Sequence, residues 1–292
     1  MLSQIFGLID PRTSEKRPKT MFFVGMFYAS AALLLVNWFF AKDLVLSEFS
    51  GMIVVTFTVM LSYPFMYFLM KQENEDDIKV DSFVGVWNAH KDAIYAFMWL
   101  FLGFVIAFAF WNILLGNADL FNAQIKTYCR INSPGNLEGC VENYAFASSS
   151  SLTGAASGGL RFLAILENNV YVMISSLIFS LLFGVGAIFI LAWNASVIST
   201  AIGVFTKFSL REIPYGLGRY LIHGIPEILA YFITGLAGGI IGVAIVRYGV
   251  KDVRTLHVIK NSVLLLCLAI VFLIVGAFIE VFITPTLFNR LM

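Results

Sequence analysis

The residues best suited to chemistry in this sequence are polar side chains embedded in strongly apolar segments. His223 and Glu227 belong to the motif His-Gly-Ile-Pro-Glu, which leads into a glycine-rich apolar run. Residues four apart share one face of a continuous helix, so this imidazole and carboxyl could act together on a proton or an ion. A carboxylate at the centre of a membrane helix costs about 2.5–3.5 kcal/mol on insertion scales, which makes Glu227 the strongest candidate for a functional residue.

The same motif also fits the start of a helix. Pro226 suits the first helical position because the amide hydrogen that proline lacks would have no partner there. Glu227 would then lie in the first turn, where the positive end of the helix dipole favours a carboxylate. The two interpretations, a helix start at the membrane interface and a polar intramembrane site, both stay open at this point.

Three asparagines adjoin the long apolar segments. Asn168 and Asn169 precede one such segment, where asparagine commonly caps a helix. Asn194 follows that segment and precedes a second apolar stretch, 195–206, which at about 12 residues is too short to cross a ~30 Å hydrocarbon core. We expect either a re-entrant half-helix or an overhang of the preceding span here. Asn194 would cap the short helix or line a polar site with His223 and Glu227.

No catalytic set can be assembled from the remaining residues. His90 and His257 fall in predicted loops, and a zinc ion at His223 and Glu227 would need further ligands that the sequence does not provide. The sequence contains no phosphate-binding loop, no CxxC pair and no HExxH motif. We therefore expect no enzyme activity, no cofactor and no metal, and the net charge of +1 gives no reason to expect a nucleic-acid partner.

The composition defines the elements that must position these residues. Of the 292 residues, 59% are hydrophobic and 13% are charged, with a mean hydropathy of +0.86. Soluble domains carry about 25% charged residues, so this chain lacks the polar surface of a soluble globule. We predict an all-α polytopic membrane protein with about six transmembrane helices, surrounded by the lipid bilayer.

Apolar runs and charges divide the chain into four regions. Basic residues before the first span place the N-terminus in the cytoplasm of a multi-pass cell-membrane protein. Segment 71–92 then faces the cytoplasm, and its acidic run predicts a solvated loop, with a contact to a cation or a partner as the alternative. The regions are a basic, amphipathic N-terminal segment (1–20), a three-span membrane region (21–115), an extracytoplasmic loop (116–167) and a C-terminal membrane region (168–292).

The topology of the C-terminal region conflicts with the charge rule. Six simple spans place segment 247–260, with four basic residues, outside the cell. A re-entrant hairpin at 221–246, bending at its glycines, would return that segment to the cytoplasm and leave five spans. Because a run of about 26 residues is long enough to cross the bilayer, six spans is the leading prediction.

Two further features indicate contacts. Cys129 and Cys140 share the extracytoplasmic loop, which makes them a disulfide candidate and the loop a surface for an external protein partner. Small residues in the membrane spans let helix backbones approach closely, within one chain or across a homodimer. These predicted packing residues are Ser176, Ser180, Gly184, Gly186, Gly235, Gly238, Gly239 and Gly242.

The order of these motifs resembles the stage II sporulation protein M family of bacterial and archaeal membrane proteins. The resemblance rests on Leu166-Glu167-Asn168-Asn169, Gly184, Gly186, Asn194 and the motif from His223 to Glu227. The resemblance implies a membrane scaffold, since the sporulation member of the family resembles an organiser of peptidoglycan-degrading enzymes. For this chain the resemblance implies the membrane architecture and the motif positions, and not the role in sporulation. We expect a scaffold or anchor that binds partners through the outer loop. The alternative is a transporter or channel with Glu227, His223 and Asn194 lining a polar site.

Overall fold

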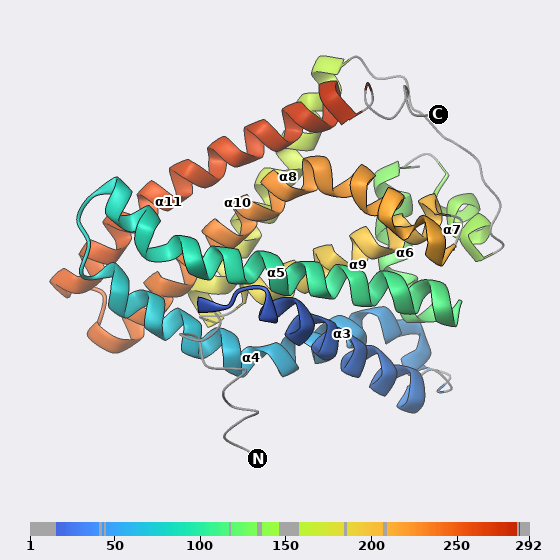
Figure 1. Ribbon diagram of the computed structural model, residues 1–292, viewed down its shortest axis with the longest axis horizontal. Coiled ribbons are helices and arrows are strands. Elements are labelled where there is room, and N and C mark those ends of the chain that lie inside the picture. The colour runs from blue at the N-terminus through green and yellow to red at the C-terminus, as the bar shows by residue number, and fades with distance from the viewer. Residues whose placement is uncertain are drawn as a thin grey trace.

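The apolar segments fold into helices that pack side by side in one elongated bundle (Figure 1). The computed structural model describes residues 16–40, 43, 45–116, 118–132, 136–145, 158–183, 186–206, 209–284 and 286. Six helices within this part are long and apolar enough to span a membrane, and the same part contains no strand. The predicted all-α, multi-pass membrane fold is confirmed. The predictions for segment 1–15 and for Gly184 lie outside the described residues.

The first three spans form an N-terminal layer. They are α3 (Thr20–Phe39), α4 (Ser50–Asp77), which follows the short turn η1 (Leu46–Phe49), and α5 (Phe83–Leu115). Gly25 of α3 packs directly on the backbone of Leu100, which leaves no space for a side chain. Further along both helices, the indole Nε1 of Trp111 donates to Ser30 Oγ at 2.9 Å. Both contacts advance in the same direction, so α3 and α5 run parallel.

The second half of the chain adds four more helices after the outer segment. The outer segment consists of η2 (Ala118–Phe121), α6 (Asn122–Asn132) and α7 (Leu137–Ala145). The four helices that follow are α8 (Gly158–Phe183), α9 (Ala187–Phe205), α10 (Ile213–Tyr248) and α11 (Val253–Phe278). The short turn η3 (Leu210–Glu212) precedes α10, and the π-helical segment η4 (Ile279–Ile283) follows α11. Ser176 of α8 lies beside Tyr231 of α10, and Ser180 lies beside Gly235. Helices α8 and α10 are therefore parallel neighbours, and α9 must return the chain between them.

Two turns meet at one end of the bundle. The guanidinium Nη1 of Arg247, next to the α10–α11 turn, lies 3.0 Å from Glu75 Oε1, and Asn261 Nδ2 donates to Val80 O at 3.0 Å in the α4–α5 turn. We call this end the turn end, and the opposite end, which carries α6 and α7, the loop end (Figure 1).

The leading sequence prediction for segment 247–260 is therefore wrong. Six simple spans would separate it from segment 71–92, yet both lie at the turn end because α9 adds one more pass of the chain along the bundle. The hairpin alternative is also wrong, since α10 continues as one helix through its glycines. The predicted short helix after the fourth span is present, but α9 begins earlier than expected, at Ala187.

Several helices are longer than a bilayer requires. Helix α5 has 33 residues, or about 50 Å at 1.5 Å per residue, compared with a hydrocarbon core of ~30 Å. Helix α3, with 20 residues, is about 30 Å long, so its two ends mark the approximate limits of the hydrocarbon core. Because Gly25 packs at Leu100, the first turns of α5 extend beyond α3 toward the turn end. The predicted solvated loop at 71–77 is wrong, since this segment continues α4 as a helix.

Candidate functional site

Glu227 lies in the middle of a membrane helix and not at a helix start. Helix α10 begins at Ile213, has Pro214 in its first turn and continues through Pro226. Proline is tolerated inside membrane helices because neighbouring groups and local adjustments satisfy the freed backbone. The local sequence around Pro226 resembles a helix start, but the helix had already begun upstream. The helix-start interpretation of Glu227 is therefore wrong.

The depth of Glu227 follows from its neighbours. Phe232, five residues later, stacks on Phe97 of α5 with ring centroids 5.4 Å apart and meets Phe101 edge-on at 5.9 Å. These residues of α5 lie level with the first turns of α3, since Gly25 contacts Leu100. Glu227 is about 7.5 Å further toward the loop end. Its carboxyl therefore lies within the depth that α3 spans, where a polar group requires partners.

Helices α8 and α11 face this carboxyl. A Cβ atom added to Gly276 of α11 would lie 2.6 Å from Glu227 Cγ, so the two helices touch at this point. The Asn169 amide and the Glu280 carboxyl are close enough to act electrostatically on Glu227. The Oε1 atom of Glu227 is buried without a hydrogen-bond partner among the described residues.

Asn168 and Asn169 do not form the helix cap that the sequence predicted. Both lie inside α8, which begins at Gly158, so the prediction that they cap the fourth span is wrong. Asn169 is 6% exposed, and its Oδ1 accepts a hydrogen bond of 2.9 Å from the Tyr231 hydroxyl. Asn168 is exposed on the helix surface and donates to the same Oδ1 at 3.4 Å. Asn169 thus joins the Glu227 site, and Asn168 supports it from the edge.

The other predicted polar residues divide into two groups. His223, one turn before Glu227, lies 3.4 Å from the Thr284 hydroxyl through its Nδ1 atom. Asn194 lies within α9, and its amide donates to the Ile190 carbonyl of its own helix at 2.7 Å. The capping role predicted for Asn194 is therefore wrong, and the structure does not bring it into the Glu227 set.

Two members of this set were missed by sequence reasoning. Glu280 is a carboxylate in an apolar final span, so the criterion that selected Glu227 also applies to it. Tyr231 follows Glu227 by four residues, which places both on one helix face. Nothing in the local sequence pairs either residue with Asn169 of α8.

The predicted small-residue faces hold α8 against α10 within one chain. Ser180 Oγ donates to Gly235 O at 2.6 Å, and Ser176 Oγ donates to Tyr231 O at 3.4 Å. A Cβ atom at Gly238 would lie 2.7 Å from Leu177 O, and one at Gly242 would lie 2.7 Å from Leu181 O. A homodimer would need a different surface. Two further predicted residues are buried or packed in the same chain: Gly239 is buried, and Gly186 lies against the Phe179 backbone.

A second buried polar cluster lies at the turn end. His90 of α5 is fully buried, with Nδ1 2.6 Å from Glu73 Oε2 and Nε2 2.9 Å from Asp77 Oδ1. The two carboxyl groups, both on α4, are at most 1% exposed. The predicted loop positions of His90 and His257 are wrong, because these residues lie in α5 and α11.

The geometry of this cluster sets the minimum number of protons that it must hold. A neutral imidazole has one N–H, so two hydrogen bonds to carboxylates require either an imidazolium or one protonated carboxyl. Either arrangement leaves a net charge of −1. Asn261 of α11 donates to Asp77 Oδ2 at 3.2 Å, and His257 lies 2.8 Å from Val80 O. The cluster therefore fastens α4 and α5 to α11.

The outer segment is attached to the membrane helices by a buried amide. Gln124 of α6 donates to Gly51 O of α4 at 2.9 Å and to Ser196 Oγ of α9 at 3.1 Å. Cys129, five residues later, is buried, and its sulfur is bonded to that of Cys140 on α7 with an S–S distance of 2.07 Å. Helix α6 is thus held on one side by the bundle and on the other by α7.

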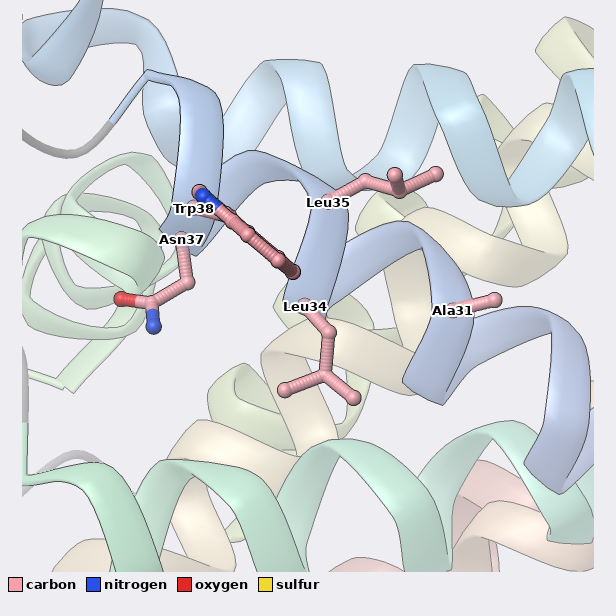
Figure 2. A pocket seen from close by; sticks show the side chains of 5 residues that line it. All are labelled: Ala31, Leu34, Leu35, Asn37 and Trp38. Atoms are coloured by element: carbon pink, nitrogen blue, oxygen red, sulfur yellow. The ribbon is translucent and has the colours of Figure 1, made fainter.

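A metal site and an apolar hollow are the other kinds of site to compare with these polar clusters. Within the described ranges, no three His, Cys, Asp or Glu side chains are arranged to hold a metal ion. A shallow hollow opens on the outward face of α3, where Figure 2 shows Ala31, Leu34, Leu35, Asn37 and Trp38. Its lining is mainly apolar, and Trp38 is 80% exposed at the helix end, a position typical of the membrane interface.

The long apolar helices and the polar groups between them define a polytopic α-helical membrane protein. A family model described as Stage II sporulation protein M matches residues 94–285, more than half of the chain. The chain belongs to this family, as the motif resemblance indicated. An uncharacterized protein of Methanocaldococcus jannaschii is 33% identical over 137 residues, which cover 45% of this chain and 75% of that protein. No solved structure matches the chain.

Proposed function

We propose that the protein is a non-enzymatic membrane anchor that holds a partner protein at its loop end. The observation that carries this proposal is the double attachment of α6, through Gln124 to α4 and α9 and through Cys129 to α7. A helix fixed in this way presents its outer face in one orientation. Binding to a preorganised surface avoids the entropy cost of ordering a loop on contact.

The exposed charges of α6 provide the test. Lys126 and Arg130 are exposed on α6, and Lys91 is an exposed lysine on α5 toward the turn end. The double variant K126E/R130E is expected to lose most co-purifying partner from native membranes, whereas K91E retains it. Quantitative mass spectrometry after cross-linking measures both. The proposal fails if partner recovery is unchanged in K126E/R130E and also after deletion of residues 136–159.

We also propose that the turn end faces the cytoplasm of the cell. Basic residues gather there, with Arg247, Lys251, Arg254 and Lys260 around the α10–α11 turn, and cytoplasmic loops carry an excess of such residues. A cysteine placed at Lys251 should react with a membrane-impermeant thiol reagent only after cells are opened. Reaction in intact cells would reverse the proposed orientation. A cysteine at Glu138 of α7 is the control that should react in intact cells.

A second candidate function is an ion or solute conduit, which the half-buried Glu227, with its buried Oε1 atom, favours. Ionisable groups at membrane depth mark ion and proton paths in many transporters. Glu227→Gln keeps the shape of the side chain and removes its charge, so pH-dependent flux in proteoliposomes should disappear. Flux that persists in E227Q, or its absence from the wild type with protons and monovalent cations as probes, would argue against this candidate.

A further inference from the structure

A half-buried histidine faces the α4–α5 turn from the first turns of α11. His257 has a side chain that is 21% exposed. Its Nε2 atom lies 2.8 Å from Val80 O, and its Nδ1 atom lies 3.4 Å from Asp81 Oδ1. Val80 and Asp81 are consecutive residues of the turn, so both nitrogens of one imidazole contact the same short segment. The Asp81 side chain is 84% exposed, so water reaches this contact.

Only a doubly protonated imidazole suits both contacts. A backbone carbonyl accepts hydrogen bonds and cannot donate them, and an ionised carboxylate also only accepts. In one neutral tautomer of His257, the lone pair of Nδ1 would face Asp81 Oδ1. In the other, the lone pair of Nε2 would lie 2.8 Å from Val80 O. The imidazolium carries an N–H on each nitrogen, so it satisfies both oxygen atoms together.

Asn261 connects this histidine to the buried cluster at the turn end. Its Nδ2 atom donates to Val80 O at 3.0 Å and to Asp77 Oδ2 at 3.2 Å, and the same atom lies 3.2 Å from His257 Nε2. The Val80 carbonyl has two lone pairs and can accept from both side chains. Asp77 belongs to the His90 cluster, whose two carboxyl groups leave a negative net charge. This charge attracts an imidazolium that shares the Asn261 amide with it.

Charges of both signs lie around His257. The negative groups are Asp81 of the turn and, through the shared amide, Asp77 of α4. On its own helix, Arg254 and Lys260 lie one turn away on either side. Arg254 forms an ion pair of 3.0 Å with the carboxylate that caps α11, and Lys260 is exposed to water and salt, which screen its charge. The two carboxylates therefore dominate the field at the imidazole.

We propose that His257 is a proton-controlled latch between α11 and the α4–α5 turn. As an imidazolium it contacts Val80 and Asp81 and holds the turn against the helix. Loss of the proton to water leaves a neutral imidazole, which keeps one contact and repels the other acceptor, so the turn is released. Histidine changes its charge between about pH 5 and 8. The latch is therefore closed at the acidic end of this range and opens as the pH rises. The inference is independent of the α6–α7 surface and of the conduit candidate.

Distance measurements between spin labels test the latch in lipid nanodiscs, where both faces of the membrane meet the buffer. The labels replace Val84 on α5 and Val253 on α11, two exposed side chains beside the two turns. At about pH 5.5 we expect one narrow distance distribution, and at about pH 8 a broader one. The released population should grow about two- to fivefold, the range for an exposed ion pair. Nitrogen-15 NMR at the acidic pH should show two N–H groups on His257.

Variants of the two partners separate the latch from other pH effects. His257→Gln and Asp81→Asn each remove one side of the ion pair and should abolish the change with pH. Asp92→Asn alters another exposed carboxylate, on α5, and should retain it. Because Asp81 lies at the surface, D81N is the decisive variant if H257Q does not fold. The proposal is overturned by distances that do not change with pH, by a pH response that persists in D81N, or by an unprotonated ring nitrogen of His257 at the acidic pH.

Discussion

Replacing His90 by alanine removes the central member of the buried cluster at the turn end. The two contacts of His90, at 2.6 and 2.9 Å, join groups that are at most 1% exposed. Hydrogen bonds to charged groups contribute about 1.5–3 kcal/mol each, and removing one partner of a buried ion pair costs about 3–5 kcal/mol. The variant also leaves Glu73 and Asp77 facing each other without a cation. We therefore expect H90A to lower the free energy of unfolding by at least about 3 kcal/mol.

Equilibrium unfolding in bicelles by steric trapping measures this loss without harsh denaturants. Lys91→Ala, on the exposed side of the same helical turn, should stay within about ±0.5 kcal/mol of the wild type. Acidification should restore part of the stability of H90A, because protonation neutralises the two buried carboxyls that have lost their cation. Replacing Glu73, Asp77 and His90 together by leucine, leucine and phenylalanine should cost far less than H90A, since a packed apolar set can substitute for a buried ion cluster.

A small effect would refute the reasoning. If H90A costs less than about 1 kcal/mol, His90 behaves like a surface residue and the cluster does not fasten α4 to α5. A large loss that is the same at neutral and acidic pH would show that packing, and not charge, explains the effect.

Three further predictions concern other parts of the chain. Gln124→Leu should detach α6 and accelerate its amide exchange, with a stability loss of about 1–3 kcal/mol measured by the same unfolding assay, because two buried bonds are lost. Gly238→Val should separate α8 from α10 and reduce the yield of folded protein, whereas Gly224→Ala, where an added Cβ meets nothing within 4 Å, should be neutral or stabilising. The side chain of Arg254, and then its backbone N–H, lower the pKa of the Asp252 carboxyl to about 2. Amide exchange in the first turn of α11 should therefore be slower in the wild type than in Asp252→Asn. This difference should persist down to about pH 4 and disappear as the pH falls through about 2.

Length and hydropathy were sufficient to predict the six long spans, because the thickness of a bilayer dictates how many apolar residues each helix needs. The helix boundaries were not predictable in the same way. Asn168 and Pro226 have the residue types of helix starts, yet both lie inside helices that begin upstream at Gly158 and Ile213. Packing along a bundle longer than the membrane outweighed these local preferences. The extra pass of α9 was missed as a full helix because the apolar run after Asn194 is short.

The candidate site was only partly predictable for a related reason. Glu227 stands out in the sequence because a carboxylate in an apolar run is costly. Its partners come from other helices, Asn169 from α8 and Glu280 from the end of α11, and no local pattern connects them. His90 was assigned to a loop because its segment is polar, and only the pairing of α5 with α4 shows that Glu73 and Asp77 enclose it.

The contact between Asp77 and Asn261 sets an order for the biosynthesis of this protein. At about 5–20 residues per second, a ribosome makes His90 roughly 1–3 s after Asp77. Asn261 follows Asp77 by 184 residues, which corresponds to roughly 10–40 s. The α4–α5 hairpin can thus pair its own charges while the rest of the chain is still being made. Its attachment to α11 must wait for the final helix, so a nascent chain that stops early lacks the contact that closes the turn end.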